Sequence, residues 1–385
     1  MRFILSTKFL HRNTVLLFLF FIIVLMGNMN GFITVATVWS LLLIILLPLH
    51  KYIDSQCVVL VLFSILYAIF GNFTGFAGSI HQTILCLLPV AFYLFGSYII
   101  RYFDSERMLL VFILLMLSLY SFEVYSTIIK EISSTGSIVN TSRLFYFHGD
   151  QSRQLTATLV GLNVSVGMIG VPMCIILKKY RILRWLYLAI GCLSIITTIY
   201  LVNRSGLFIL FLSLSLICIY YYKKQRVRLL FICLSLLFLF MLLKKLGIIG
   251  TEVFDAYYRR NSVDLLTGGD RPRRWLEALS YLFHYPFGWA DNNGTTSYYI
   301  HNMWLDIAKV VGIIPFTLLV LATVMSLNRI PQLFRRERDY VAASLLGMHV
   351  CFFSSCFLEP VYGGLHLCLY VMVWGMTNSY LRIES

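Results

Sequence analysis

Charged residues are scarce in this sequence. Asp, Glu, Lys and Arg make up only 12% of its 385 residues, while 59% are hydrophobic, and about a quarter of an ordinary soluble domain is charged. The mean hydropathy of +0.82 agrees with this bias. The composition excludes a soluble fold. It predicts an all-α, polytopic integral membrane protein, because apolar runs of about 20 residues recur along the chain.

Several catalytic and metal-binding patterns are also missing. The sequence has no GxxxxGK[ST] phosphate loop, no HExxH, no GxSxG and no Asp-x-Asp for a metal-bound nucleotide sugar. These absences argue against a cytosolic enzyme that uses nucleotides. All nine cysteines fall in apolar segments, without zinc-ligand spacing. We therefore expect no disulfide framework, no metal site and no cofactor.

Apolar runs divide the chain into twelve predicted transmembrane helices. They cover residues 14–28, 32–49, 57–76, 82–100, 108–128, 157–177, 185–202, 206–222, 229–248, 303–326, 340–358 and 365–381. The first follows a basic stretch, as a signal peptide does, but no small-x-small cleavage site follows it, so we expect an uncleaved anchor. Residues 1–385 then form a single transmembrane domain, with residues 249–302 as an inserted loop element between the ninth and tenth spans.

Lys and Arg place the N-terminus inside. With that orientation every short basic loop lies on the inner side, as the retention of positive charge during membrane insertion requires. Most of the net charge of +14 is then a consequence of topology. It gives no reason to expect nucleic acid as a partner, and membrane lipids are the expected surroundings. The two long segments, 129–156 and 249–302, are predicted to face the periplasm.

The second long segment predicts a helix of its own. Asp270 is positioned to cap a helix that has Pro272 in its first turn and runs from Arg273 to Tyr285. Trp275, Leu279, Leu282 and Phe283 share one face, and Arg273, Glu277, Ser280 and His284 line another. This amphipathic pattern is typical of a helix that lies in the membrane surface.

Ionisable residues of the predicted spans gather at the outer level. They are Glu123, Asp306, Lys309 and Glu359, with Arg204 in a short outer turn and His301 just before the tenth span. Charges inside membranes are costly, so each is a candidate site residue. We interpret the group as an outer-facing polar cavity. The structural alternative is a set of packed pairs, such as Asp306 with Lys309.

Three segments between residues 200 and 320 carry a more specific pattern. They are Asn203-Arg204-Ser205-Gly206, then Gly269-Asp270-Arg271 with Trp275 and Pro286-Phe287-Gly288, and then His301-Asn302-Met303-Trp304-Leu305-Asp306 running to Gly312. In order, spacing and predicted side of the membrane they resemble the O-antigen ligase and polymerase family of membrane glycosyltransferases. Before residue 200 only topology supports the resemblance. The sequence departs from the pattern at Pro272-Arg273-Arg274, which makes the loop more basic and leaves open which arginine meets phosphate.

The resemblance implies an activity. A glycan would pass from undecaprenyl diphosphate to a sugar hydroxyl at the periplasmic face, with inversion and without metal. Arg204 and Arg271 would hold the diphosphate, because guanidinium groups bind phosphate bidentately. His301 would orient or deprotonate the acceptor hydroxyl. Further substrate contacts are expected from Arg273, Arg274, Trp275, Asn302, Asp306 and Glu123.

Each of these residues also has a structural interpretation. The structural alternative is a lipid-headgroup anchor for Arg204, an interfacial arginine that reaches toward water for Arg271, and a helix start for His301. Arg273 and Arg274 are more often interface charges than ligands. The aromatic residues Trp275, Trp289, Tyr298, Tyr299 and Trp304 fit an interfacial belt as well as stacking on sugars.

The acceptor distinguishes the two activities in the family. A ligase would use the lipid A-core saccharide, and a polymerase another lipid-linked repeat. One dominant outer loop with a basic helix favours a ligase, because that helix would meet a phosphorylated, anionic core. A glycolipid flippase or transporter is the alternative from another class, although it would not need the two arginines and the histidine. A purely structural role is disfavoured by the cost of the outer charges.

Overall fold

The computed structural model describes residues 7–27, 32–74, 80–140, 144–146, 154–222, 271–289, 300–336, 338–358 and 364–383. Its helices are α1 (Thr7–Leu25), α2 (Phe32–Leu46), η1 (Leu49–Lys51), α3 (Ser55–Phe73), α4 (Ile80–Tyr102), α5 (Glu106–Thr135), α6 (Ala157–Ser165), η3 (Val166–Ile169), α7 (Gly170–Ile176), α8 (Arg181–Tyr200), α9 (Arg204–Tyr221), α12 (Arg271–His284), α13 (Met303–Val311), α14 (Ile313–Leu327), α15 (Ile330–Arg335), α16 (Tyr340–Leu358) and α17 (Leu365–Ile383). A short antiparallel pair, β1 (Leu144–Tyr146) and β2 (Gln154–Thr156), aligns Leu144 with Thr156. The all-α prediction is confirmed apart from this hairpin.

Among the described residues, seven helices are long and apolar enough to cross a membrane. They are α3, α4 from Thr83, α5, α8, α9, the stretch Ile313–Arg335 that joins α14 and α15, and α16. Shorter apolar helices correspond to the first, second and sixth predicted spans. The predicted span 229–248 lies outside the described residues. The chain is therefore a helical membrane protein, and the count of twelve spans stays a prediction.

Helix α17 forms the centre of the bundle. Its residues from Leu365 to Leu381 are all buried, which explains why its sequence is apolar on every side. Helix α4 lies directly against it. A Cβ atom on Gly375 would lie 2.1 Å from the Tyr93 carbonyl oxygen, and one on Gly96 2.2 Å from that of Met372. Small residues thus bring the two backbones together, as is common between membrane helices.

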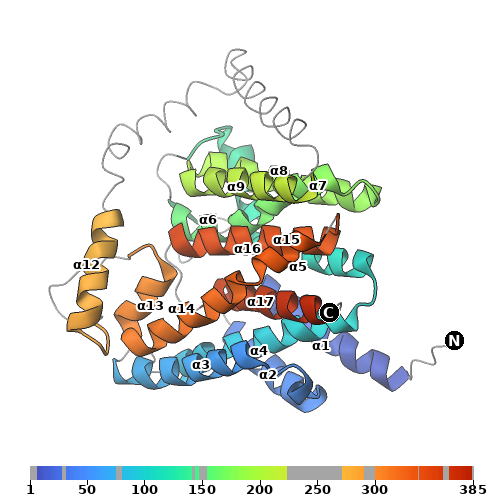
Figure 1. The fold of residues 1–385 in the computed structure, drawn as a ribbon. Coiled ribbons are helices and arrows are strands. Elements are labelled where there is room, and N and C mark those ends of the chain that lie inside the picture. Colours follow the sequence, from blue (N-terminus) through green and yellow to red (C-terminus); the bar gives the residue numbers. More distant parts are fainter. Residues whose placement is uncertain are drawn as a thin grey trace.

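The two ends of the bundle differ. Most helix axes run in a similar direction, and the start of α1 and the end of α17 lie at the same end (Figure 1). Helix α12 lies at the opposite end, across the direction of the other helices (Figure 1). If the N-terminus is inside, the α12 end is the outer end. We use the terms inner end and outer end in this sense.

The prediction of one continuous span over 303–326 is wrong, because Gly312 divides this segment into α13 and α14. Gly312 has a φ of 81°, which L residues rarely adopt. Pro315 lies in the first turn of α14, where its missing N–H costs no helical hydrogen bond. The predicted span 157–177 is also irregular, since the 3-10 turn η3 separates α6 from α7.

Candidate functional site

His301 lies in a tight turn immediately before α13. Its backbone has a φ of 59°, a left-handed conformation that costs a residue other than glycine about 1–3 kcal/mol. Asp306 is fully buried, and its carboxylate accepts hydrogen bonds from the backbone N–H groups of Ile300 at 2.9 Å and Asn302 at 3.3 Å. One carboxylate therefore holds the residues on both sides of His301 and enforces its strained conformation.

Asn302 completes the start of α13. Its side-chain oxygen accepts a hydrogen bond from the Leu305 N–H at 3.2 Å, the interaction expected of an N-cap. Asn302 is also buried. Both roles tie Asn302 and Asp306 to the backbone of the turn, and for these two residues the geometry favours positioning His301 over contact with a substrate.

Helix α12 is joined to this turn by Trp275. The indole N–H donates to the Ile300 carbonyl oxygen at 3.0 Å, and the ring packs edge-on against Phe357 of α16 at 4.9 Å. A small core lies beneath, formed by Ala278, Leu282, Trp289, Ile300, Leu305 and Ala308. Helix α12, residues 285–289, residues 300–302 and α13 therefore form one packed body, which we call the outer unit.

The segment Pro286-Phe287-Gly288 and the following Trp289 connect the end of α12 to both α13 and α14. The N–H of Ile313 donates to the Pro286 carbonyl oxygen at 2.9 Å, and that of Trp289 to the Lys309 carbonyl oxygen at 2.8 Å. A Cβ atom on Gly312 would lie 2.0 Å from the Pro286 oxygen, so only glycine fits there. The sequence segments between Trp275 and Gly312 that suggested a family resemblance thus meet in one place.

The predicted apolar face of α12 meets protein over only part of its width. Leu282 of that face is buried, together with Ala278, whereas Leu279 and Phe283 are exposed, as is Leu276. The helix packs on protein along only one stripe, so a second apolar stripe remains on its outer surface, where a helix in the membrane surface would meet lipid. This arrangement agrees with α12 lying across the ends of the other helices (Figure 1).

The arginines of α12 occupy different surroundings. Arg273 forms an ion pair with Glu277 at 2.9 Å, and its side chain is 81% exposed, so the interpretation as an interface charge fits it. Arg271 and Arg274 are half-buried. Arg271 is the first residue of the helix. It is therefore better placed than Arg273 to face the interior of the outer end.

Arg204 is the first residue of α9, in the short turn predicted from the sequence. Asn203 caps the helix by accepting a hydrogen bond from the Gly206 N–H at 3.2 Å. The first turns of α9 and α12 hold no acidic residue. Because the helix dipole is positive at this end, an arginine there disfavours the helix. The same placement of a cation beside a helix N-terminus favours a bound anion.

Contacts connect Arg204 to the outer unit only indirectly. Helix α9 packs against α16, and α16 also contacts α13.

Among the other predicted residues, Glu123 in α5 and Lys309 in α13 are buried. Gly269, Asp270, Tyr298, Tyr299 and Glu359 lie outside the described residues.

Sequence reasoning missed a buried chain of side chains near the outer end. The ring of His366 lies between the Tyr120 hydroxyl, 2.8 Å from Nδ1, and the Ser355 hydroxyl, 2.8 Å from Nε2. It links α5, α16 and α17. A histidine within an apolar span was the available signal, since such residues need partners.

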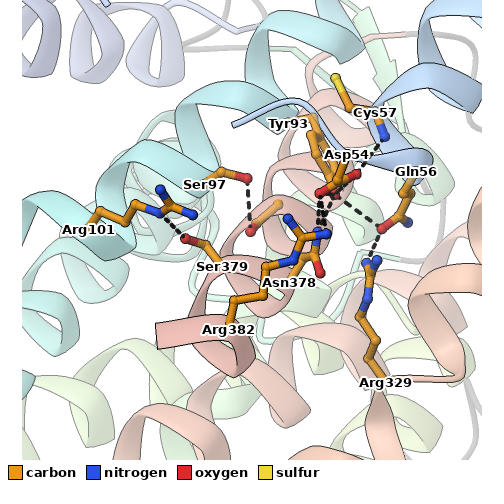
Figure 2. Close-up of polar contacts among 11 residues, drawn as sticks. Asp54, Gln56, Cys57, Tyr93, Ser97, Arg101, Arg329, Asn378, Ser379 and Arg382 are labelled. Atoms are coloured by element: carbon orange, nitrogen blue, oxygen red, sulfur yellow. Dashed lines mark hydrogen bonds and ion pairs between the residues drawn. The ribbon is translucent and has the colours of Figure 1, made fainter. Parts of the chain in front are cut away.

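A second network was missed at the inner end. Asp54 accepts hydrogen bonds from the Tyr93 hydroxyl at 2.8 Å and from Asn378, and it lies 3.6 Å from a terminal nitrogen of Arg382. Gln56 accepts a hydrogen bond from Arg329 beside it (Figure 2). We call these residues the Asp54 network. In the sequence its arginines indicated only the orientation of the chain in the membrane, because an arginine in a loop gives no sign that its partner is buried.

Chemically, the outer end offers arginines at helix starts and a histidine on a strained turn. Within the described part of the chain, no three His, Cys, Asp or Glu side chains are grouped to hold a metal ion.

Comparison of the sequence with protein-family models gives no match, and comparison with curated proteins gives none either.

Proposed function

We propose that the chain is an inner-membrane glycosyltransferase that moves a glycan from undecaprenyl diphosphate to a sugar hydroxyl at the periplasmic face. The observation that carries the proposal is the His301 turn, in which a buried carboxylate holds a strained backbone at the outer end. Strain of this kind tends to cluster at functional sites. A helix-start histidine with no further role would not need it.

The proposed reaction is a direct displacement. The acceptor hydroxyl oxygen attacks the anomeric carbon of the donor sugar, and the bond from that carbon to the diphosphate oxygen breaks, so the configuration inverts. His301 takes the hydroxyl proton. Arg204 and Arg271 stabilise the negative charge that develops on the departing lipid diphosphate.

The arginines support a diphosphate substrate. Arg204 and Arg271 each begin a helix, where a cation weakens the helix but strengthens anion binding. The family resemblance of the sequence implies the same two residues as diphosphate ligands. An enzyme that cleaves a sugar–diphosphate bond needs positive charge at the leaving group, and these positions supply it.

Within this reaction class we propose an O-antigen ligase, with the lipid A-core saccharide as acceptor. The exposed Arg273 and the half-buried Arg274 extend the basic surface of α12, which favours an anionic acceptor. An O-antigen polymerase, with a lipid-linked repeat as acceptor, is the alternative. Deleting the gene and analysing surface polysaccharide distinguishes them. Long chains left on the lipid carrier support the ligase, single repeats on the lipid core support the polymerase, and normal surface glycan contradicts both.

The periplasmic site requires the orientation inferred from charge. A cysteine at Thr295, in the predicted outer loop, should react with an impermeant thiol reagent in cells with a permeabilised outer membrane. A cysteine at Gln332, in α15, should not react. The unsubstituted chain, which already contains nine cysteines, measures background labelling. The opposite pattern would contradict the orientation and therefore the periplasmic site.

A further inference from the structure

A cavity of about 580 Å³ opens at the inner end, away from the outer unit. It lies where the end of α4, the start of α5, the start of α16 and the end of α17 meet. Its polar wall consists of Arg101, Asp104, Glu106, Asp339 and Tyr380, and the rest of the wall is apolar. The volume falls within the roughly 300–1,000 Å³ of typical small-molecule sites. Neither the proposed reaction nor the Asp54 network uses it.

Arg101 supplies the positive charge of the cavity. Its Nε donates to the Ser379 hydroxyl at 3.3 Å, as Figure 2 shows, and its guanidinium lies 5.3 Å from the centre of the Tyr52 ring. These two contacts fix its orientation. Its two terminal nitrogens make no hydrogen bond with a described residue, so the fork of the guanidinium stays available for an oxyanion.

Asp104 and Glu106 supply the negative charge. Asp104 is exposed and has no ion pair within the described part of the chain. One oxygen of Glu106 accepts a hydrogen bond from the Tyr180 hydroxyl at 2.7 Å and lies 3.7 Å from Lys179 Nζ. A hydrogen bond with Tyr180 and then the charge of Glu106 raise the pKa of Lys179.

Asp339 belongs to the protein's own bonding. One of its oxygens accepts hydrogen bonds from the N–H groups of Val341 and Ala342, and the other from the Tyr380 hydroxyl. It thereby caps α16 and holds the end of α17. The wall thus carries one cation, Arg101, and three carboxylates. Asp339 is held by the protein's own hydrogen bonds, Glu106 has one oxygen beside Lys179, and Asp104 has no ion pair within the described residues.

We propose that this cavity binds the headgroup of a zwitterionic aminophospholipid of the inner leaflet, with the phosphate against Arg101 and the primary ammonium against Asp104 and Glu106. A purely anionic headgroup would meet the two carboxylates, and a simple cation would meet Arg101. The apolar part of the wall suits the glycerol and the start of the acyl chains. The position agrees with a lipid source, because the basic loops mark this end as the inner membrane surface.

Lipid binding to the purified full-length chain in detergent tests the proposal. Phosphatidylethanolamine, phosphatidylcholine and phosphatidylglycerol with identical acyl chains are compared by native mass spectrometry. We expect phosphatidylethanolamine to bind about fivefold more tightly than the other two, a size typical of exposed charge pairs. The choline headgroup keeps the charge but cannot donate N–H hydrogen bonds to the carboxylates.

Two substitutions assign the preference to the cavity. Asp104→Asn should reduce the preference for phosphatidylethanolamine over phosphatidylglycerol, and Arg101→Gln should weaken all three lipids. Arg181→Gln, which removes an exposed arginine from another inner helix start, should change neither. Equal binding of the three lipids by the unsubstituted chain would overturn the proposal without any variant. Competition by free phosphoethanolamine at the concentration of the lipid would overturn the lipid as the ligand.

Discussion

Both ends of the molecule contain a buried aspartate, but the two carboxylates bind different partners. Asp306 at the outer end accepts hydrogen bonds from the backbone on either side of His301. Asp54 at the inner end caps α3 and otherwise binds side chains of other helices, among them Tyr93 and Asn378. A carboxylate bound to backbone fixes the shape of one turn, whereas one bound to several helices fixes how they pack. The outer end is therefore built to present a side chain, and the inner end to hold the bundle together.

The largest effect is expected at the residue that the outer turn presents. His301→Gln keeps a polar side chain of similar reach but removes the proton acceptor, so transfer should fall by about 10²- to 10⁴-fold. Binding of the lipid-linked donor should persist. Purified protein with a lipid-linked donor and a defined acceptor measures both. Near-normal turnover would remove His301 as the base and leave the buried carboxylates of Glu123 and Asp306 to test.

The arginines at the helix starts should show the next largest effect. Arg204→Lys and Arg271→Lys keep the charge but lose the planar fork, so transfer should fall roughly ten- to hundredfold, the cost of one charged hydrogen bond. Arg273→Lys, at the exposed ion pair with Glu277, is the matched control and should have little effect. Mild, equal effects of Arg204→Lys, Arg271→Lys and His301→Gln, together with normal surface glycan, would favour a transporter.

Substituting the two aspartates tests the comparison directly. In either variant the Asn side chain has an NH₂ group in place of one accepting oxygen, and this group faces a donor with which it cannot bond. Each variant should therefore lose about 1–3 kcal/mol of stability. Asp306→Asn should also reduce transfer about tenfold, because His301 loses its position. Asp54→Asn should leave the activity of the folded fraction unchanged. Folded fraction by size-exclusion chromatography and transfer rate are measured on the same samples. Equal losses of specific activity would erase the distinction between the two ends.

Smaller effects are expected where glycine joins the outer unit to α14. Gly312 and Gly136 both have positive φ, of 81° and 69°, but a Cβ atom on Gly136 would have no neighbour within 4 Å. Gly136→Ala should cost about 1–2 kcal/mol for the backbone alone. Gly312→Ala should cost clearly more because of the contact with Pro286. Unfolding in mixed micelles measures both, and equal costs would show that the Pro286 contact relaxes freely.

The smallest expected effect is that of a chelator. The proposed charge stabilisation comes from Arg204 and Arg271, so transfer should continue in EDTA. Transfer rates before and after chelation give the answer. Loss of activity that magnesium or manganese restores would move the candidate role from the arginines to the carboxylates of Glu123, Asp306 and Glu359.

The sequence predicted the helices better than the breaks between them. Long apolar runs located the spans, and the polar pattern at Arg273 to Tyr285 located α12, because both signals repeat over many residues. The family pattern ended the helix after His301 at Gly312, but the apolar run alone predicted a span through it, since a single glycine in an apolar run is also compatible with a continuous helix. The three-residue strands β1 and β2 are too short to produce a periodic signal.

For the site, residue types were predictable and partners were not. An aspartate in an apolar span indicated an unusual environment. The sequence spacing suggested Lys309 as the partner of Asp306 and gave no sign of its hydrogen bonds with the backbone of Ile300 and Asn302. Asp54 looked like part of an inner loop, because its partners lie more than 30 residues away on other helices. Long-range pairs of this kind leave no local pattern to detect.

The two described residues that flank positions 290–299, Trp289 and Ile300, have a consequence for changes in the length of the chain between them. On one side of this segment the Trp289 N–H donates to the Lys309 carbonyl oxygen, and on the other the Ile300 N–H donates to Asp306. Both anchors are therefore on α13. Insertions or deletions between them would leave the His301 turn undisturbed, since loop closure depends only weakly on length. Changes in length between these two residues are thus uncoupled from the turn that presents His301.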